Sequence, residues 1–145
     1  MKPTSTSATA LALRPRWLIV DDEPALSEII ADTLAALDLA SVENFTAPAA
    51  ALAAFSARAG AFDLVVTDRD MPGCDGLEFA RRLHAQAPGV KVVLVSAHTD
   101  DLSTAELRRA GIGAVVRKPF NLARLETAVR ALACAPDDAP LAHAA

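Results

Sequence analysis

Residues 63–76 read DLVVTDRDMPGCDG and contain one of the short apolar runs from which the fold class can be predicted. This run, residues 64–67, ends at the acidic Asp68. Similar runs occur at residues 17–20, 40–45, 90–96 and 113–117, of which 40–45 is the weakest. Continuous apolar runs are typical of strands that are buried on both faces of a parallel sheet. We therefore expect five parallel strands.

Longer amphipathic stretches alternate with these runs. Apolar residues recur at three- and four-residue spacing in residues 24–37, 47–59, 77–87, 101–110 and 122–133, which predicts five helices. Pro24 suits the first turn of its helix, and Gly60 and Gly111 stand where C-terminal caps belong. The alternation predicts an α/β, flavodoxin-like, doubly wound sheet with strand order 2-1-3-4-5 and helices on both faces.

Length and composition predict one globular domain. The chain has 145 residues, of which 52% are hydrophobic and 22% charged. We place the folded domain at residues 16–133. Residues 1–15 and 134–145 contain few bulky apolar side chains and no periodicity, so we expect them to be disordered tails.

Charge and hydropathy exclude several classes of function. The formal net charge is -4 and the basic residues are dispersed, which argues against direct nucleic-acid binding. No apolar run approaches the roughly 20 residues of a membrane-spanning helix, and no signal sequence is visible, so we expect a cytoplasmic protein. Cys74 and Cys134 lack the spacing of a disulfide framework or a zinc site and are expected to be free thiols.

Polar side chains follow the predicted strands at their carboxyl ends. Asp21 and Asp22 follow the first strand, Asp68 closes the third, Ser96 the fourth and Lys118 the fifth. With the first and third strands adjacent, the three carboxylates converge at the edge where open α/β sheets bind ligands. The alternative for Asp21-Asp22 is a helix N-cap, since Asp caps a first turn well.

Three clustered carboxylates indicate a divalent cation site, because they would otherwise repel one another. Oxygen ligands suit Mg²⁺ or Mn²⁺. One carboxylate can then act as a nucleophile toward a phosphoryl group, whose remaining oxygens Ser96 and Lys118 would bind.

The chain resembles the receiver domains of bacterial two-component response regulators. The matching segments, in chain order, are Leu18-Ile19-Val20-Asp21-Asp22-Glu23, Asp63-Leu64-Val65-Val66-Thr67-Asp68, Met71-Pro72-Gly73 with Asp75-Gly76, Val93-Leu94-Val95-Ser96-Ala97, and Arg117-Lys118-Pro119-Phe120. The resemblance covers about residues 16–133.

The resemblance implies a role for each of these polar residues. Asp68 is the implied phosphoacceptor. The implied metal ligands are Asp21, Asp22, Asp68 and the backbone carbonyl of Asp70, with Asp22 and Asp68 binding directly. Ser96, Ala97 and Lys118 are implied to bind the phosphoryl group, with Ser96 as the switching hydroxyl. The Lys118–Pro119 bond is expected to be cis.

The same resemblance implies a signalling module and not an enzyme acting on other substrates. A phosphohistidine on a kinase or phosphotransfer protein would donate its phosphoryl group to Asp68, and the chain would catalyse only its own phosphorylation and dephosphorylation. We expect a stand-alone receiver that signals through altered protein–protein contacts or passes the phosphoryl group on in a phosphorelay.

Three positions differ from the usual pattern or fall where the family varies. Many receivers have an aromatic residue three positions before the lysine, but here it is Val115, so the usual coupling of the hydroxyl to an aromatic ring cannot operate. Asp70 and His98 lie two residues after Asp68 and Ser96 and are expected to tune the phosphoryl lifetime. The alternative for His98 is an exposed residue at a helix start.

Three other functions fit less well. Asp68-Arg69-Asp70 resembles the Asp-x-Asp of haloacid-dehalogenase-type phosphatases, but Pro72 stands where they have Thr. A dinucleotide site needs a Gly-rich turn after the first strand, where this chain has acids. The more serious alternative is a receiver-like interaction module that is not phosphorylated in the cell.

Overall fold

The main sheet of the computed structural model is parallel. The model describes residues 14–98, 100–136 and 141–144. The sheet contains β1 (Arg16–Val20), β2 (Ser41–Phe45), β3 (Leu64–Asp68), β6 (Lys91–Ser96), β7 (Ile112–Arg117) and β8 (Ala142–Ala144). Its order is β2-β1-β3-β6-β7-β8. The first five strands have the predicted order 2-1-3-4-5, so the predicted fold class is confirmed.

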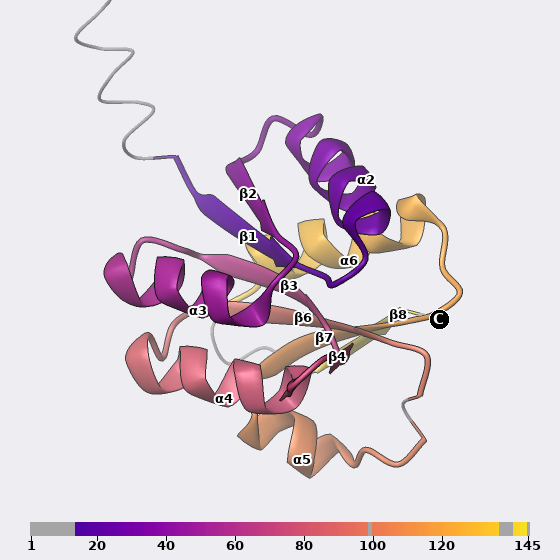
Figure 1. Cartoon of the computed structure of the whole chain (residues 1–145). Coiled ribbons are helices and arrows are strands. Elements are labelled where there is room, and N and C mark those ends of the chain that lie inside the picture. The colour runs from indigo at the N-terminus through magenta and orange to yellow at the C-terminus, as the bar shows by residue number, and fades with distance from the viewer. Residues whose placement is uncertain (1–13, 99, 137–140, 145) are drawn as a thin grey trace, which may run out of the picture.

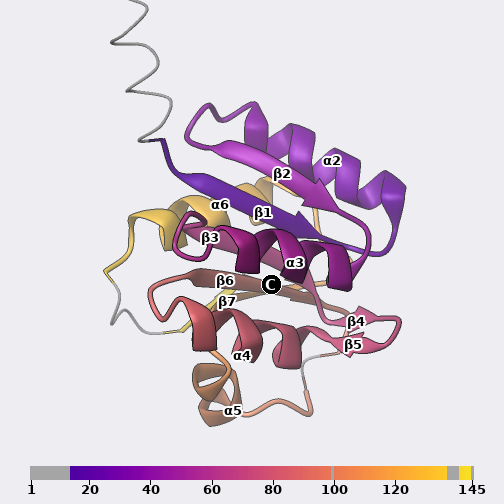
Figure 2. The ribbon, with the colours of Figure 1, turned by 60° about the vertical axis from the view of Figure 1, so that its left-hand side comes forward.

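Helices cover both faces of this sheet (Figures 1 and 2). They are α2 (Pro24–Ala35), α3 (Pro48–Ala57), α4 (Gly76–Gln86), α5 (Thr104–Arg109) and α6 (Leu122–Cys134). The helices α2 and α6 lie on one face, and α3, α4 and α5 lie on the other. None of the helices in the described ranges has the length and apolar character needed to cross a bilayer.

Alternation along β1 explains the two layers. Trp17 and Ile19 belong to the core under α2 and α6, whereas Leu18 and Val20 belong to the core under α3, α4 and α5. All four side chains are buried. Successive side chains of a strand point to opposite faces, so an unbroken apolar run is needed where both faces are covered.

The helix α5 is shorter than the sequence predicts. It begins at Thr104, not at residue 101, because Ser103 and Glu106 form a capping box that starts the helix there. Asp101 therefore lies in the loop between β6 and α5. Gly111 follows this helix with φ +82, as expected of a C-terminal cap.

A small hairpin follows β3 and was not predicted. It consists of β4 (Asp70–Met71) and β5 (Cys74–Asp75), which pair antiparallel around Gly73 at φ +73. Pro72-Gly73 supplies the turn, since glycine adopts positive φ without strain. The hairpin delivers Asp75 to the start of α4, where its side chain accepts a hydrogen bond from the Leu77 N–H at 2.7 Å. Both cysteines are free, as predicted.

The expectation that residues 134–145 form a disordered tail is wrong for the strand β8. Residues 142–144 pair in parallel with β7, with Ala142 opposite Ala114 and Ala144 opposite Val116. An edge strand has unpaired backbone groups that an adjacent extended segment can satisfy. Most of the predicted N-terminal tail, residues 1–13, lies outside the described residues, as do 137–140 and 145.

Candidate functional site

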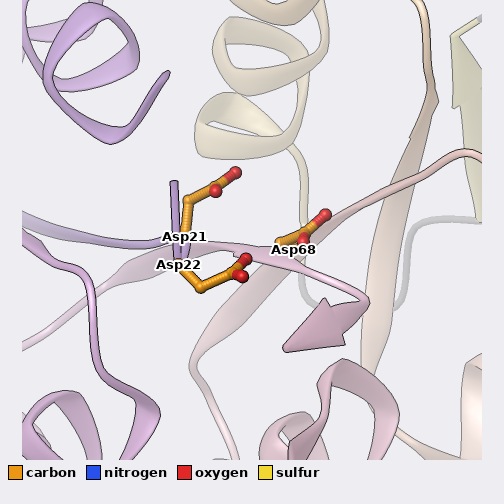
Figure 3. Close-up of side chains that lie close together, drawn as sticks. All are labelled: Asp21, Asp22 and Asp68. Atoms are coloured by element: carbon orange, nitrogen blue, oxygen red, sulfur yellow. The ribbon is translucent and has the colours of Figure 1, made fainter. Parts of the chain in front are cut away.

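Three carboxylates meet at the carboxyl end of the sheet (Figure 3). Asp21 and Asp22 follow β1, and Asp68 ends β3. Each residue offers one carboxylate oxygen, and these oxygens all lie within 4.8 Å of one another. The sequence prediction that these three side chains converge is therefore confirmed.

The pairing of β1 with β3 produces this cluster. Val20 pairs with Thr67, so the next residues, Asp21 and Asp68, lie beside each other at the carboxyl ends of the two strands. Asp21 is 2% exposed, and its Oδ1 accepts a hydrogen bond from the Glu23 N–H at 2.9 Å. The N-cap position of α2 is occupied by Glu23, with no side-chain cap. The alternative of an N-cap role at Asp21-Asp22 is therefore not observed.

Lys118 faces the cluster from the residue after β7. Its Nζ lies 2.9 Å from the Oδ1 of Asp68, which is 5% exposed. The Lys118–Pro119 peptide bond is cis, as expected. Ser96 is fully buried at the end of β6, the strand next to β3. Its Oγ donates to the His98 carbonyl at 2.8 Å and accepts from the His98 N–H at 3.0 Å.

The remaining predicted site residues lie at the rim. Asp70 is exposed on the hairpin strand β4, and Ala97 and His98 are exposed in the loop after β6. His98 thus precedes α5 by several residues and does not begin it. Val115 is buried in the core on the α3, α4 and α5 face.

Burial dominates the electrostatics of the acids. It raises the pKa of Asp21, with a smaller contribution from the charge of Asp68. Burial also raises the pKa of Asp68, and the ion pair with Lys118 only partly opposes this effect. Burial works against the charge of Lys118, but the hydrogen bond and charge of Asp68 outweigh it and raise the Lys118 pKa. The cluster therefore carries more buried negative charge than one lysine compensates.

The donor set fits a hard divalent cation. Asp21, Asp22 and Asp68 supply oxygen ligands, two of them from carboxylates that burial has deprived of water. Mg²⁺ and Mn²⁺ favour such ligands, and their positive charge would offset the cost of ionising the buried acids.

Comparison with known proteins identifies the family. Residues 17–130 match the response regulator receiver domain. The chain belongs to this family. Receivers bind Mg²⁺ at an acidic pocket and act as phosphoacceptor signalling modules, and this receiver has a carboxylate cluster that could hold a metal ion.

Individual relatives agree with this assignment. The receiver is 32% identical over 113 residues to the transcriptional regulatory protein FixJ of Azorhizobium caulinodans, covering 78% of this chain and 52% of FixJ. It is 31% identical over 130 residues to the DNA-binding response regulator MtrA of Mycolicibacterium smegmatis, covering 88% of this chain and 54% of MtrA. The chain thus spans about half the length of these two relatives.

Solved structures show the same fold. The non-phosphorylated HemR receiver domain of Leptospira biflexa superposes with a TM-score of 0.75 at 24% identity, covering 84% of this chain and 96% of that one.

The prediction that this chain does not bind nucleic acid directly stays a prediction, because MtrA is by name a DNA-binding protein.

Gly76, the first residue of α4, packs against the backbone of the site, a role that its sequence motif does not reveal. A Cβ here would lie 2.5 Å from the Asp68 carbonyl oxygen and 2.8 Å from the Arg69 Cα. Glycine therefore lets α4 start directly against the backbone of Asp68.

Gly76→Ala is expected to destabilise the receiver by about 1–3 kcal/mol, since the overlapping atoms belong to the main chain and cannot rotate away. Urea unfolding measures this change. Gly89→Ala is the matched control, because nothing lies within 4 Å of a Cβ built there. Equal stability of the two variants would contradict the assigned packing role of Gly76.

Asp21→Asn is expected to stabilise the cation-free receiver near neutral pH, because burial raises the pKa of Asp21 and so disfavours its charged form. The pKa of Asp21 is raised in the folded state, so stability falls as pH rises through that pKa. The Asn side chain does not ionise, so the variant avoids this pH-dependent loss of stability. Its amide oxygen still accepts the hydrogen bond from the Glu23 N–H.

Thermal unfolding in EDTA and in MgCl₂ measures the effect of this substitution. Mg²⁺ is expected to raise the Tm of the wild type more than that of Asp21→Asn. The exposed Asp32 of α2 offers a control, since Asp32→Asn removes one charge away from the site. A Tm in EDTA that is lower for Asp21→Asn than for the wild type would show that the buried charge does not destabilise the fold.

Proposed function

We propose that Asp68 accepts a phosphoryl group from a phosphohistidine of a kinase or phosphotransfer protein. One observation carries the proposal: the buried Asp68 carboxylate lies 2.9 Å from Lys118 and within reach of the Asp21 and Asp22 carboxylates. A nucleophile, a cation-binding pair and a positive charge are thus assembled around one point. Phosphoryl transfer depends mainly on such positioning and charge compensation.

The transfer step conserves atoms and charge. A carboxylate oxygen of Asp68 attacks phosphorus, and the P–N bond of the phosphohistidine breaks. The electron pair of that bond returns to the ring nitrogen, and a proton from solvent keeps the leaving imidazole neutral. In hydrolysis a water attacks the same phosphorus, the P–O bond to Asp68 breaks, and inorganic phosphate leaves.

Asp21, Asp22, Asp68 and the backbone carbonyl of Asp70 would hold the Mg²⁺ or Mn²⁺ ion. When bound, the cation supplies positive charge for the phosphoryl oxygens. Lys118 exchanges its contact with the Asp68 carboxylate for one with the phosphoryl group, and Ser96 with the adjacent Ala97 binds another oxygen. These changes alter the receiver's contacts with a partner protein or prepare the next transfer of a phosphorelay.

An apolar cavity beside Lys118 supports a protein donor. It has a volume of about 480 Å³, and its lining includes Leu26, Phe120 and Leu122 together with Ile29 of α2, which is 48% exposed. A helix that carries the phosphohistidine would cover these apolar side chains next to Asp68. Exposed apolar patches beside a reactive group are typical of protein docking sites.

The proposal is tested by incubation with acetyl phosphate followed by intact-mass measurement. One added phosphoryl group is expected with Mg²⁺ and none with EDTA. A parallel reaction with a phosphorylated histidine phosphotransfer protein tests the donor class. Absence of labelling from both donors would favour the alternative, an interaction module that is not phosphorylated in the cell.

Asp70→Ala is expected to lengthen the lifetime of the phosphorylated state by about tenfold, and His98→Ala by less. Both side chains are exposed at the rim, where water must approach Asp68 in line. The Asp70 carboxylate can accept a hydrogen bond from that water and orient it, and a tenfold change needs only about 1.4 kcal/mol. Loss of phosphate at fixed Mg²⁺ measures the lifetime. A shorter lifetime in Asp70→Ala would mean that the acid protects the phosphoryl group.

A further inference from the structure

Arg69, the residue after Asp68, fastens the loop between β6 and α5. Its guanidinium makes two parallel hydrogen bonds to the Asp101 carboxylate, at 2.9 and 2.8 Å, and a third to the His98 carbonyl oxygen. The Arg69 side chain is only 12% exposed. A planar guanidinium that binds a carboxylate through two bonds has a defined geometry, unlike most surface ion pairs.

Arg69 and the Ser96 hydroxyl share one acceptor. Both donate to the carbonyl oxygen of His98, and the His98 N–H donates back to the Ser96 Oγ. In this conformation the Ser96 hydroxyl is occupied by the loop. Movement of Ser96 toward a phosphoryl group on Asp68 must break its bond to His98, and this changes the environment of the Arg69 guanidinium.

The Arg69–Asp101 contact lies close in the chain to the start of α5. Asp101 lies two residues before Ser103, whose side chain caps α5 together with Glu106. The hydrogen bonds from Arg69 lower the pKa of Asp101 to about 2, which is the direction expected for a carboxylate held by a guanidinium. The neighbouring Asp100 pairs with Arg117 through a longer contact of 3.8 Å.

We propose that Arg69 is a positioning residue that holds the β6–α5 loop in the unphosphorylated conformation, and that its release of Asp101 carries the signal from Asp68 to α5. This inference rests on the proposed function, because it concerns the response of the same site to phosphorylation. It supplies a route that needs no aromatic ring at Val115. The route runs from the Ser96 hydroxyl through the His98 carbonyl to the Arg69 guanidinium, and from there to the Asp101 carboxylate.

The test is a beryllofluoride titration in Mg²⁺, followed by amide NMR at Asp101 and through α5. Asp101→Asn removes the ionic partner and keeps the side-chain shape. It is expected to raise the apparent beryllofluoride affinity about three- to tenfold, because less of the free protein is held in the binding-incompetent state. The chemical-shift change in α5 on binding should shrink, since part of it already occurs in the free variant.

Asp100→Asn is the matched control and should behave as the wild type. Arg69→Gln should reproduce Asp101→Asn, and the double variant should add little to either, because the two residues act through one contact. Asp101→Glu should restore part of the wild-type response.

The possible failures are distinguishable. A wild type without any Mg²⁺-dependent response to beryllofluoride overturns the proposed function and the inference with it. A responsive wild type whose Asp101→Asn variant has unchanged or lower affinity, or the same α5 response as Asp100→Asn, overturns the inference alone.

Discussion

Asp68→Asn is expected to abolish phosphorylation by acetyl phosphate. The substitution replaces the carboxylate with an amide of the same shape. The neutral amide lacks the anionic oxygen that attacks phosphorus. The site otherwise persists, since Asp21, Asp22 and Lys118 remain around a side chain that is 5% exposed in the wild type. Intact-mass measurement in Mg²⁺ should find one phosphoryl group on the wild type and none on the variant.

The control for this prediction lies at the other end of the same strand. Asp63 is exposed and immediately precedes β3, so Asp63→Asn removes one acid without touching the cluster. It should label as the wild type does. Labelling of Asp68→Asn that persists in EDTA would place the phosphoacceptor elsewhere in the chain.

Lys118→Met is expected to weaken Mg²⁺-dependent beryllofluoride binding about ten- to a hundredfold. A hydrogen bond to a charged group is worth roughly 1.5–3 kcal/mol, and Lys118 contacts Asp68 at 2.9 Å. Some phosphorylation should remain, because the carboxylates are intact, but the response of α5 should be reduced. Beryllofluoride titration by NMR measures both the affinity and the response.

Lys91→Met is the control for this second prediction. Lys91 starts β6 at the opposite end of the sheet and donates to the Ala133 and Ala135 carbonyls, so its removal deletes one charge far from Asp68. Chemical-shift changes of equal size in Lys118→Met and wild type would show that Lys118 does not transmit the phosphorylated state.

Much of the site could be predicted because it depends on chain order and strand ends. Asp21, Asp22, Asp68, Ser96 and Lys118 each follow or end a buried strand. In a parallel sheet these ends share one edge, so the order of the strands is enough to bring the side chains together. The cis bond at Lys118–Pro119 was expected from resemblance and could not come from periodicity.

Other features depend on contacts that leave no local pattern. Arg69 is one charged residue among many in the sequence, and its partner Asp101 lies 32 positions further along the chain. The sequence pattern places Asp101 in a helix, so it gives no indication that Asp101 lies in a loop and binds Arg69. Gly76 matches a motif, but the reason for glycine appears only when α4 starts against the backbone of Asp68.

The parallel sheet, its two covered faces and the acidic residues at its carboxyl end could all be predicted from the sequence, because they follow from apolar periodicity and from which residue ends each strand. The pairing of β8 with the edge strand β7 and the contact of Arg69 with the loop before α5 are seen only in the folded structure. Both are contacts between segments distant in the chain. Their geometry depends on how the whole sheet positions the loops, which no local pattern specifies.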